Sequence, residues 1–320
     1  MLIVHRTSIV IVTPALADAN NGNWRTARRW AQMLSPAYRV RVVREWTDGD
    51  EALMIALHAR RSAASVRAWR ARRAGAPLLL VLTGTDLYRD LAVDADARHS
   101  VAVADALVTL NARGPAYLPE AARDRCHVVL QSCPARASLP KTDRNLRALM
   151  VGHLRDEKDP LTYLRAAARL ADRADLRFDH VGAALDPALG AQAAALAARQ
   201  PTYRWFGALP HAQTRRRIQA AHVLVHASRM EGGAHVVIEA VCSGTPVLAS
   251  RIDGNLGLLG DDWPATFEVG DDAALAGWLV RLREEPALLS DLRARAADRA
   301  EAFSPAREAD TLQGIVRGLL

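Results

Sequence analysis

Short apolar runs that alternate with helical segments constrain the fold of this chain more than any other feature. The runs are rich in Val, Ile and Leu, which is typical of parallel strands covered on both faces. In the first part of the chain we expect strands at residues 9–12, 38–43, 52–57, 78–82, 106–110 and 128–130, and helices at residues 23–34 and 62–73. This pattern predicts a doubly wound α/β fold.

The alternation stops once and then restarts. Residues 131–144 contain Pro134, Pro140 and several turn-forming residues, so this segment reads as a linker between two domains. A chain of 320 residues is long enough for two domains of about 150 residues each. We therefore expect a first Rossmann-like domain at residues 1–140, a second at residues 141–304, and a last helix at residues 305–320 that packs back on the first domain.

The chain is strongly basic, and arginine supplies almost all of the positive charge. The net charge is +7, and Lys141 and Lys158 are the only lysines. Nucleic-acid binding is disfavoured because no zinc finger, RNA-binding signature or aromatic interleaving accompanies the arginines. A basic cleft for a small anionic substrate uses the same charge more economically.

The cysteines and the N-terminal segment indicate the cellular compartment in which the protein is expected. Cys126, Cys133 and Cys242 form neither a disulfide scaffold nor a zinc-binding pattern, so a reducing cytoplasmic location is expected. The apolar run at residues 9–12 is too short for a secretory signal and reads as a strand. No stretch approaches the length of a membrane span, and no membrane association is expected.

A strand, a loop and a helix at residues 222–242 carry the clearest binding signal. Gly232 and Gly233 stand at the expected helix start, where free backbone N–H groups and the helix dipole favour an anion such as a diphosphate. Glu231 precedes the helix, and Glu239 lies roughly 9 Å along its axis from Gly233. A nucleotide diphosphate sugar suits this spacing, with Glu239 on the ribose hydroxyls and Glu231 near the sugar. The alternative is an ordinary helix with two solvated glutamates.

A second group of candidates follows the first strand of the second domain. Gly152, Arg155 and Lys158 stand where a doubly wound domain places its ligands. The two basic side chains would stabilise the charge that develops on a departing diphosphate, in place of a metal ion. Because no carboxylate motif for a divalent metal stands in a matching place, we expect neither a metal nor any other cofactor. The alternative is a solvated cluster at a helix start.

The strand ends of the first domain carry arginines, hydroxyls and a histidine. This mixture suits a small anionic acceptor better than a neutral glycan. His58 and Asp86 are candidates for positioning the acceptor, although both residues also suit capping or turn formation. The expected acceptor-binding residues are Arg25, His58, Arg60, Arg61, Thr83, Thr85, Asp86 and Arg89.

The two glutamates separated by seven residues, with glycines after the first, resemble the signature of the family 4 retaining glycosyltransferases. The resemblance implies a GT-B fold, in which two Rossmann-like domains face a cleft that holds the active site. It also implies that loops at Gly182, Gly207 and Leu209 line the base and the ribose. Family members often place paired glycines after the first strand near the donor phosphate, whereas here Gly22 stands alone, beside Asn23, in the loop of residues 18–25.

Longer stretches resemble the selenosugar synthases of selenoneine biosynthesis. These stretches are residues 57–64, 82–90, 151–160 and 228–233, and the resemblance covers nearly the whole chain. It implies transfer of N-acetylglucosamine or glucose from a UDP-sugar to selenophosphate, with formation of a carbon–selenium bond. The residues expected to carry the chemistry are Arg155, Lys158, Glu231, His58 and Asp86.

Two alternatives share the same donor residues. One is a retaining glycosyltransferase that uses a hydroxyl acceptor, a sugar or a lipid. The other is a nucleotide-sugar binding protein without catalytic activity. The donor sugar, the anomeric outcome, the identity of any general base and the oligomeric state stay open.

Overall fold

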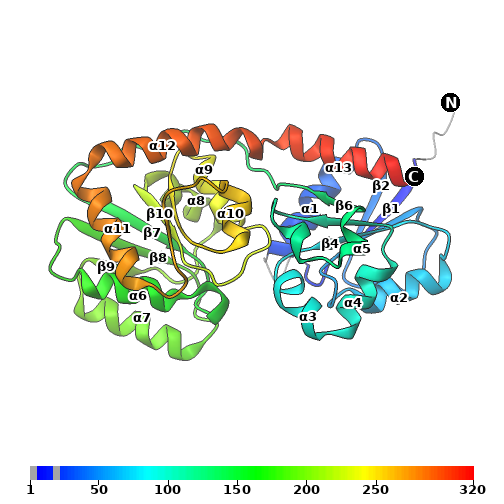
Figure 1. The fold of residues 1–320 in the computed structure, drawn as a ribbon, viewed down its shortest axis with the longest axis horizontal. Helices are drawn as coiled ribbons and strands as arrows, with labels where there is room; N and C mark the ends of the chain where they lie inside the picture. The colour runs from blue at the N-terminus through cyan, green and yellow to red at the C-terminus, as the bar shows by residue number, and fades with distance from the viewer. Residues whose placement is uncertain (1–5, 17–21) are drawn as a thin grey trace. The chain divides into compact units, whose positions relative to one another are not determined.

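The computed structural model describes residues 6–16 and 22–320. The chain forms two compact units. The first comprises Met1–Gln131, Glu231–Gly233 and Pro305–Leu320, and the second comprises Ser132–Met230 and Ala234–Ser304. Figure 1 shows that each unit is a sheet flanked by helices.

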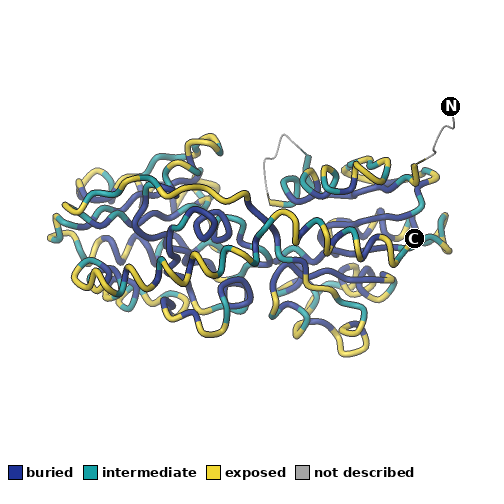
Figure 2. The backbone as a smooth tube through the Cα atoms, turned by 90° about the horizontal axis from the view of Figure 1, so that it is seen from above, coloured by how far each residue is buried: buried dark blue, intermediate teal, exposed yellow. Residues whose placement is uncertain are grey.

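The first unit contains a six-stranded parallel sheet in the order β2-β1-β3-β4-β5-β6. Figure 2 shows that its central strands are among the most buried parts of the unit, whereas the two edge strands are more exposed. The strands are β1 (Ser8–Val12), β2 (Arg39–Val43), β3 (Leu53–Leu57), β4 (Leu78–Leu82), β5 (Ala106–Thr109) and β6 (Cys126–Val128).

Helices cover both faces of this sheet. The longer ones are α1 (Gly22–Leu34), α2 (Ala63–Arg72), α4 (Ala95–Val103) and α13 (Pro305–Leu319). Ile9 packs in one core with Trp30 of α1 and Val316 of α13, whereas Val10 packs in the opposite core with Trp69 of α2. Because successive strand residues point to opposite faces, two buried faces require the unbroken apolar runs seen in the sequence.

A buried carboxylate attaches α13 to the first unit. Glu308 is 2% exposed, and its side chain accepts hydrogen bonds from Arg29 Nε at 2.9 Å and from Trp30 Nε1 at 2.7 Å. Both donors lie on α1. The C-terminal helix therefore completes one face of the first unit.

We expect Glu308→Ala to lower the free energy of unfolding by about 2 kcal/mol, because the indole N–H and the guanidinium would lose a charged acceptor. Urea denaturation followed by circular dichroism measures this change. Glu301→Ala, at an exposed position, is the control and should leave the denaturation midpoint unchanged. Equal midpoints for Glu308→Ala and the parent protein would show that the contact stabilises nothing.

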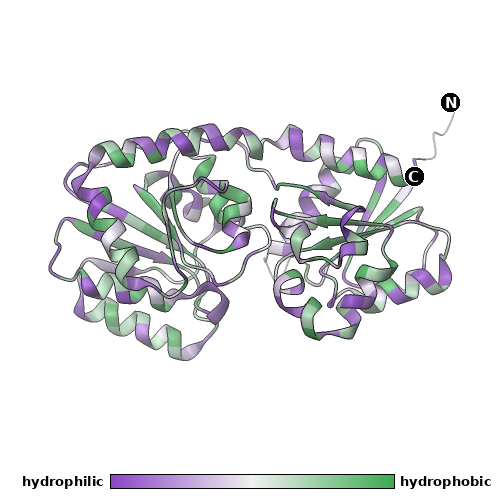
Figure 3. Ribbon diagram, in the orientation of Figure 1, coloured by the Kyte–Doolittle hydropathy of each residue, from purple (hydrophilic) through white to green (hydrophobic). Residues whose placement is uncertain are grey.

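The second unit contains another six-stranded parallel sheet, in the order β12-β11-β10-β7-β8-β9. Figure 3 shows mixed hydrophilic and hydrophobic colouring along outer helices such as α7 (Pro187–Arg199) and α12 (Pro286–Ala300). The strands are β7 (Leu146–Val151), β8 (Leu176–Val181), β9 (Tyr203–Trp205), β10 (Val223–His226), β11 (Val247–Ser250) and β12 (Thr266–Phe267). The other helices include α6 (Pro160–Arg169), α8 (His211–Ala220), α9 (His235–Val241), α10 (Asp253–Leu259) and α11 (Asp272–Glu284).

In the first part of the chain the structure differs from the expected elements at the sheet edge and in one of the longer helices. The strand expected at residues 128–130 is β6, two residues earlier, because Cys126 pairs with Leu107 and Val128 with Thr109 at the sheet edge. Helix α4 was not expected, since its segment has no strong apolar stripe. Asp94 caps α4 by accepting a hydrogen bond from the backbone N–H of Ala97.

Each sheet has one point where the order of the strands reverses. In the first unit this point lies between β1 and β3, and in the second it lies between β10 and β7. Ligands of doubly wound folds bind beyond the carboxyl ends of the strands at such points. Among the described residues, no helix is long and apolar enough to cross a membrane.

Candidate active site

Three of the predicted donor-site glycines lie together at the carboxyl ends of β7, β8 and β9. Gly152 N–H donates to the carbonyl of Val181 at 2.9 Å, and Gly182 N–H donates to the carbonyl of Gly207 at 2.8 Å. A Cβ added at Gly182 would lie 1.9 Å from the carbonyl oxygen of Gly152, so a larger residue does not fit there. Gly207 has φ +63° and open space around it. Leu209 follows, half-buried, just before α8.

Gly152, Gly182 and Gly207 form a glycine layer, and a buried histidine contacts it. His180 of β8 is fully buried, with Nδ1 3.0 Å from the hydroxyl of Tyr203 and Nε2 3.3 Å from the carbonyl oxygen of Gly152. Burial lowers the pKa of His180 to about 4, so the imidazole is neutral at physiological pH. In the neutral ring Nε2–H can donate to the carbonyl of Gly152, and Nδ1 can accept from the hydroxyl of Tyr203.

The predicted basic pair lies in the loop that leaves β7. Arg155 is half-exposed, and its Nε is 3.8 Å from Glu157 Oε2. Lys158 ends a short 3-10 turn, and its Cγ would lie 3.6 Å from a Cβ added at Gly152. The aliphatic part of Lys158 therefore lies over the glycine layer.

Arg229 joins this loop to the loop after β10. Its backbone N–H donates to the carbonyl of Glu157 at 2.9 Å, and its guanidinium Nη2 donates to Asp159 Oδ1 at 3.1 Å. Asp159 is buried with φ +44°, a left-handed conformation that aspartate tolerates better than most residues. These bonds hold the Lys158 loop at the strand-order reversal of the second sheet.

Glu239 lies on α9 and is almost fully buried. His211 Nε2 of α8 donates to Glu239 Oε1 at 2.5 Å, and His235 Nδ1 lies 3.4 Å from the same oxygen. Burial alone would raise the pKa of Glu239, but the hydrogen bond from His211 and the nearby ring of His235 hold that pKa well below its ordinary value. Glu239 is therefore a carboxylate across the physiological pH range.

The segment with the first glutamate and the paired glycines connects β10 to α9. Glu231, Gly232 and Gly233 group by their contacts with the first unit rather than the second. The helix that follows begins at His235, so the two glycines precede it by one residue, Ala234. The expected place of the glycines, just before the helix, agrees with the structure, and their role in binding stays a prediction.

In the first unit, His58 and Asp86 lie close together at the ends of β3 and β4. Asp86 is fully buried and accepts hydrogen bonds from the backbone N–H groups of Ala59, Thr83 and Gly84 at 2.8 to 2.9 Å. Both carboxylate oxygens are therefore engaged in holding the two loops together. This arrangement makes Asp86 a residue that shapes the site rather than a free base.

His58 has an unusual backbone and a partner in the next loop. Its φ is +73°, and its Nε2 lies 3.2 Å from the hydroxyl of Thr85. Burial lowers its pKa, Asp86 opposes that shift, and Arg61 adds to it. The strained conformation is consistent with a functional position, because such backbones persist only where the surroundings enforce them.

Two predicted acceptor arginines share one acidic partner. Asp90 is buried, and its Oδ1 lies 3.1 Å from Arg89 Nε and 3.6 Å from Arg60 Nη1. Arg61 is exposed beside them. Arg60 Nε also lies 3.8 Å from Asp94 Oδ2, so Asp90 and Asp94 offset part of the positive charge of the three guanidinium groups.

The loop after β1 is described only in part. Residues 17–21 of the predicted loop lie outside the described residues. Gly22, Asn23 and Arg25 form the first turn of α1, where Thr26 Oγ1 donates to the carbonyl of Gly22 at 2.9 Å. These three residues follow β1, which borders the strand-order reversal of the first sheet, and their contacts with a ligand stay a prediction.

Comparison with known proteins identifies the family. Residues 134–302 match the family described as glycosyl transferases group 1, which is more than half of the chain. The chain belongs to this family. No curated protein sequence is significantly similar to the chain.

Solved glycosyltransferases have the same fold. Sucrose-phosphate synthase from Thermosynechococcus elongatus is 18% identical, with a TM-score of 0.79 over 98% of this chain and 99% of that one. HepE from Anabaena, solved with UDP and glucose, is 15% identical, with a TM-score of 0.78 over 98% and 100%. The pneumococcal O-GlcNAc transferase GtfA, solved with UDP and GlcNAc, is 18% identical, with a TM-score of 0.65 over 83% and 57%. The predicted GT-B fold is confirmed.

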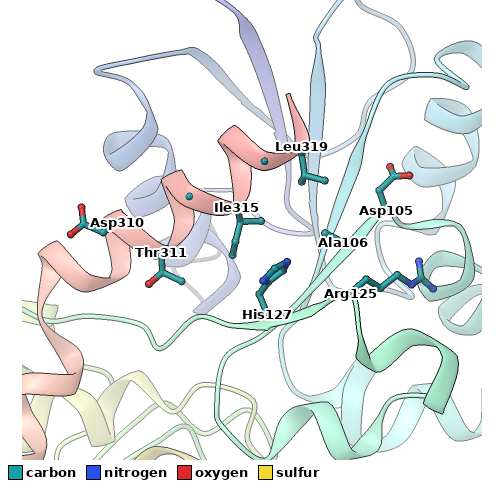
Figure 4. Close-up of a pocket in the computed structure, with 10 residues that line it drawn as sticks. Asp105, Ala106, Arg125, His127, Asp310, Thr311, Ile315 and Leu319 are labelled. Atoms are coloured by element: carbon teal, nitrogen blue, oxygen red, sulfur yellow. The ribbon is translucent and has the colours of Figure 1, made fainter.

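A cavity of about 470 Å³ in the first unit contains none of the predicted site residues. Figure 4 shows it between α13 and the edge of the sheet, with Arg125, His127 and Asp310 among its lining residues. It is widely open to solvent and lies away from the strand-order reversal. Among the described residues, no cluster of His, Cys, Asp or Glu could hold a metal ion.

In this group 1 glycosyltransferase, the sequence did not reveal the residues that hold the predicted site residues in place. They are His180, His211, Arg229 and His235. His235 and Glu239 are four residues apart on one helix, a spacing that could have revealed that pair. No sequence pattern links His180 with Gly152, His211 with Glu239, or Arg229 with Asp159, because each pair forms only when separate loops and helices meet.

We expect the stability of the protein to fall as the pH drops from about 6.5 to 4. Burial lowers the pKa of His180 and of His222 to about 4. In this window the unfolded state binds the protons that the folded state excludes, which costs roughly 2 kcal/mol per pH unit near pH 5.5 for two such histidines. Urea denaturation at pH 7.0, 5.5 and 4.5 measures the effect.

A His222→Gln variant should have a shallower loss of stability, because one of the two protonation sites is gone. His99→Gln, at an exposed position, is the control and should follow the parent curve. A flat profile between pH 7.0 and 4.5 would contradict the assignment of both buried histidines as neutral.

Proposed function

We propose that the protein is a UDP-sugar-dependent glycosyltransferase that transfers N-acetylglucosamine or glucose to selenophosphate. The observation that carries the donor half is that the Lys158 loop, at the carboxyl end of β7, lies against the glycine layer formed at the ends of β7, β8 and β9. The acceptor half rests on the resemblance to the selenosugar synthases. HepE and GtfA, solved with UDP, support the choice of the nucleotide.

The donor would bind to the second unit. Its diphosphate would lie against the side chains of Arg155 and Lys158, over the backbone of Gly152, and Glu239 would accept hydrogen bonds from the ribose hydroxyls. The base would contact the loop at Gly207 and Leu209. Two cations near the departing diphosphate would perform the electrostatic role that a divalent metal has in other transferases, so we propose a metal-independent reaction.

The acceptor would bind to the first unit. The guanidinium groups of Arg60, Arg61 and Arg89 suit a small, strongly charged anion, and His58 with Thr85 offers neutral hydrogen-bonding groups. Selenium attacks the anomeric carbon, the bond from that carbon to the diphosphate oxygen breaks, and UDP leaves. Water then hydrolyses the phosphorus–selenium bond, which releases phosphate and the selenosugar.

Mass spectrometry of a reaction with selenophosphate and either UDP-N-acetylglucosamine or UDP-glucose tests this proposal, with and without EDTA. We expect UDP and a hexose product with the isotope pattern of selenium, unaffected by EDTA. Release of UDP only with hydroxyl acceptors would replace selenophosphate by an ordinary sugar or lipid acceptor. Reversible loss of turnover in EDTA would overturn the metal-independent mechanism, and UDP binding without turnover on any acceptor would indicate a binding protein.

A further inference from the structure

His211 holds the buried carboxylate of Glu239 in one orientation. Glu239 is 4% exposed, whereas the side chain of His211 is 40% exposed at the start of α8. An ionised carboxylate only accepts hydrogen bonds, so His211 carries a proton on Nε2 and donates it to Glu239 Oε1. The histidine therefore connects a buried acceptor to the surface.

The second oxygen of this carboxylate has no partner among the described residues. His211 and His235 both contact Oε1, and within residues 6–16 and 22–320 no hydrogen bond or ion pair to Oε2 is seen. Oε2 is also not one of the fully buried polar atoms without a partner in this part of the chain, so it is accessible to solvent. A carboxylate held by one oxygen in this way presents the other oxygen to a ligand.

Other nearby groups hold the backbone of this region. His235 Nε2 lies 3.2 Å from the carbonyl oxygen of Ser132, and Arg215, one turn after His211 on α8, donates to Cys133 Sγ at 3.1 Å. Arg136 N–H donates to the carbonyl of Cys242, the residue directly after α9, at 2.8 Å. The two helices and the segment after residue 131 are therefore tied together independently of His211.

We propose that His211 is a positioning residue that makes the donor site selective for a nucleotide with an intact ribose diol. It fixes Glu239 through Oε1 so that Oε2 accepts hydrogen bonds from the ribose hydroxyls. This inference rests on the proposed function, because it takes Glu239 as the ribose-binding residue. A fixed acceptor strengthens the hydrogen bond, since no side-chain freedom is lost when the nucleotide binds.

Calorimetric titration with UDP and with 2′,3′-dideoxy-UDP tests the proposal. The parent protein should bind UDP more tightly than the dideoxy nucleotide. His211→Ala should weaken UDP binding about tenfold and leave the binding of 2′,3′-dideoxy-UDP unchanged, because only the ribose hydroxyls use the positioned carboxylate. His211→Gln, which retains an N–H donor, should recover part of the lost affinity.

Steady-state kinetics give a second readout. His211→Ala should raise KM for the UDP-sugar about tenfold with little change in kcat, since the residue acts on ribose and not on the breaking bond. His99→Ala, a histidine at an exposed position of the first unit, is the matched control and should resemble the parent protein.

The outcomes separate this inference from the proposed function. If the parent protein binds no UDP, the proposed function is wrong. If the parent binds UDP but His211→Ala discriminates between the two nucleotides as before, the positioning role is wrong. Equal weakening of both nucleotides in the alanine and glutamine variants would show that His211 only maintains the fold of the site.

Discussion

Lys158→Ala is expected to lower kcat roughly 100- to 1,000-fold, with a much smaller change in the affinity for the sugar nucleotide. Lys158 lies over the backbone of Gly152 at the carboxyl end of β7, where a diphosphate leaving group would gain negative charge as the glycosidic bond breaks. An interaction that strengthens in the transition state affects turnover more than ground-state binding. Removal of one such donor from a preorganised site typically costs this factor.

The chain offers a matched control for this experiment. Lys141, the only other lysine, lies in the segment between β6 and β7. It donates to the carbonyl oxygen of Gln219 and contacts no predicted site residue. Lys141→Ala should leave kcat within a factor of two or so of the parent. If both lysine variants lose turnover equally, or if Lys158→Ala loses donor affinity in proportion to kcat, the leaving-group role is wrong.

Glu239→Ala is expected to weaken UDP binding roughly 100-fold, which corresponds to ~3 kcal/mol. Hydrogen bonds from ribose hydroxyls to a charged acceptor contribute about 1.5 to 3 kcal/mol each, and the variant loses that acceptor. Turnover at saturating donor should fall less, because the ribose is remote from the bond that breaks. Calorimetric titration with UDP, alongside steady-state rates, measures the two effects separately.

The variant also leaves His211 and His235 without their carboxylate partner, so its thermal stability must be measured alongside binding. Glu239→Gln retains the size of the side chain and should lie between the parent and the alanine variant. Glu268→Ala, an exposed glutamate whose carboxylate lies near Arg251, is the control. Unchanged UDP affinity in a folded Glu239→Ala protein would remove Glu239 from the donor site.

The architecture could be predicted because both sheets are buried on two faces. Parallel strands in that environment need unbroken apolar runs, and such runs are visible at Leu78–Leu82 and Val223–His226. Helix α4 could not be predicted with the same ease, because its burial comes from neighbours that are distant in sequence. Ala97 and Val101 are buried there only because α4 packs with Trp69 of α2 and the strands.

Part of the candidate site could likewise be predicted from the sequence, and part could not. Motifs of a few consecutive residues, such as Gly152 to Lys158 and Glu231 to Glu239, were recognisable because a loop or helix terminus presents them without help from the rest of the chain. The spatial grouping of Gly152 with Gly182 and Gly207 followed from the rule that strand ends meet at one edge of a parallel sheet.

Local sequence therefore determined the α/β pattern, the glycines and the charged residues that carry the predicted chemistry. Tertiary structure alone decided which partners hold them: Asp86 is engaged by backbone N–H groups of two loops, Asp159 by Arg229, and Glu239 by His211. The physical reason is that backbone preference and hydrophobic pattern act over a few residues, whereas a buried polar group must find a partner wherever the packed fold provides one.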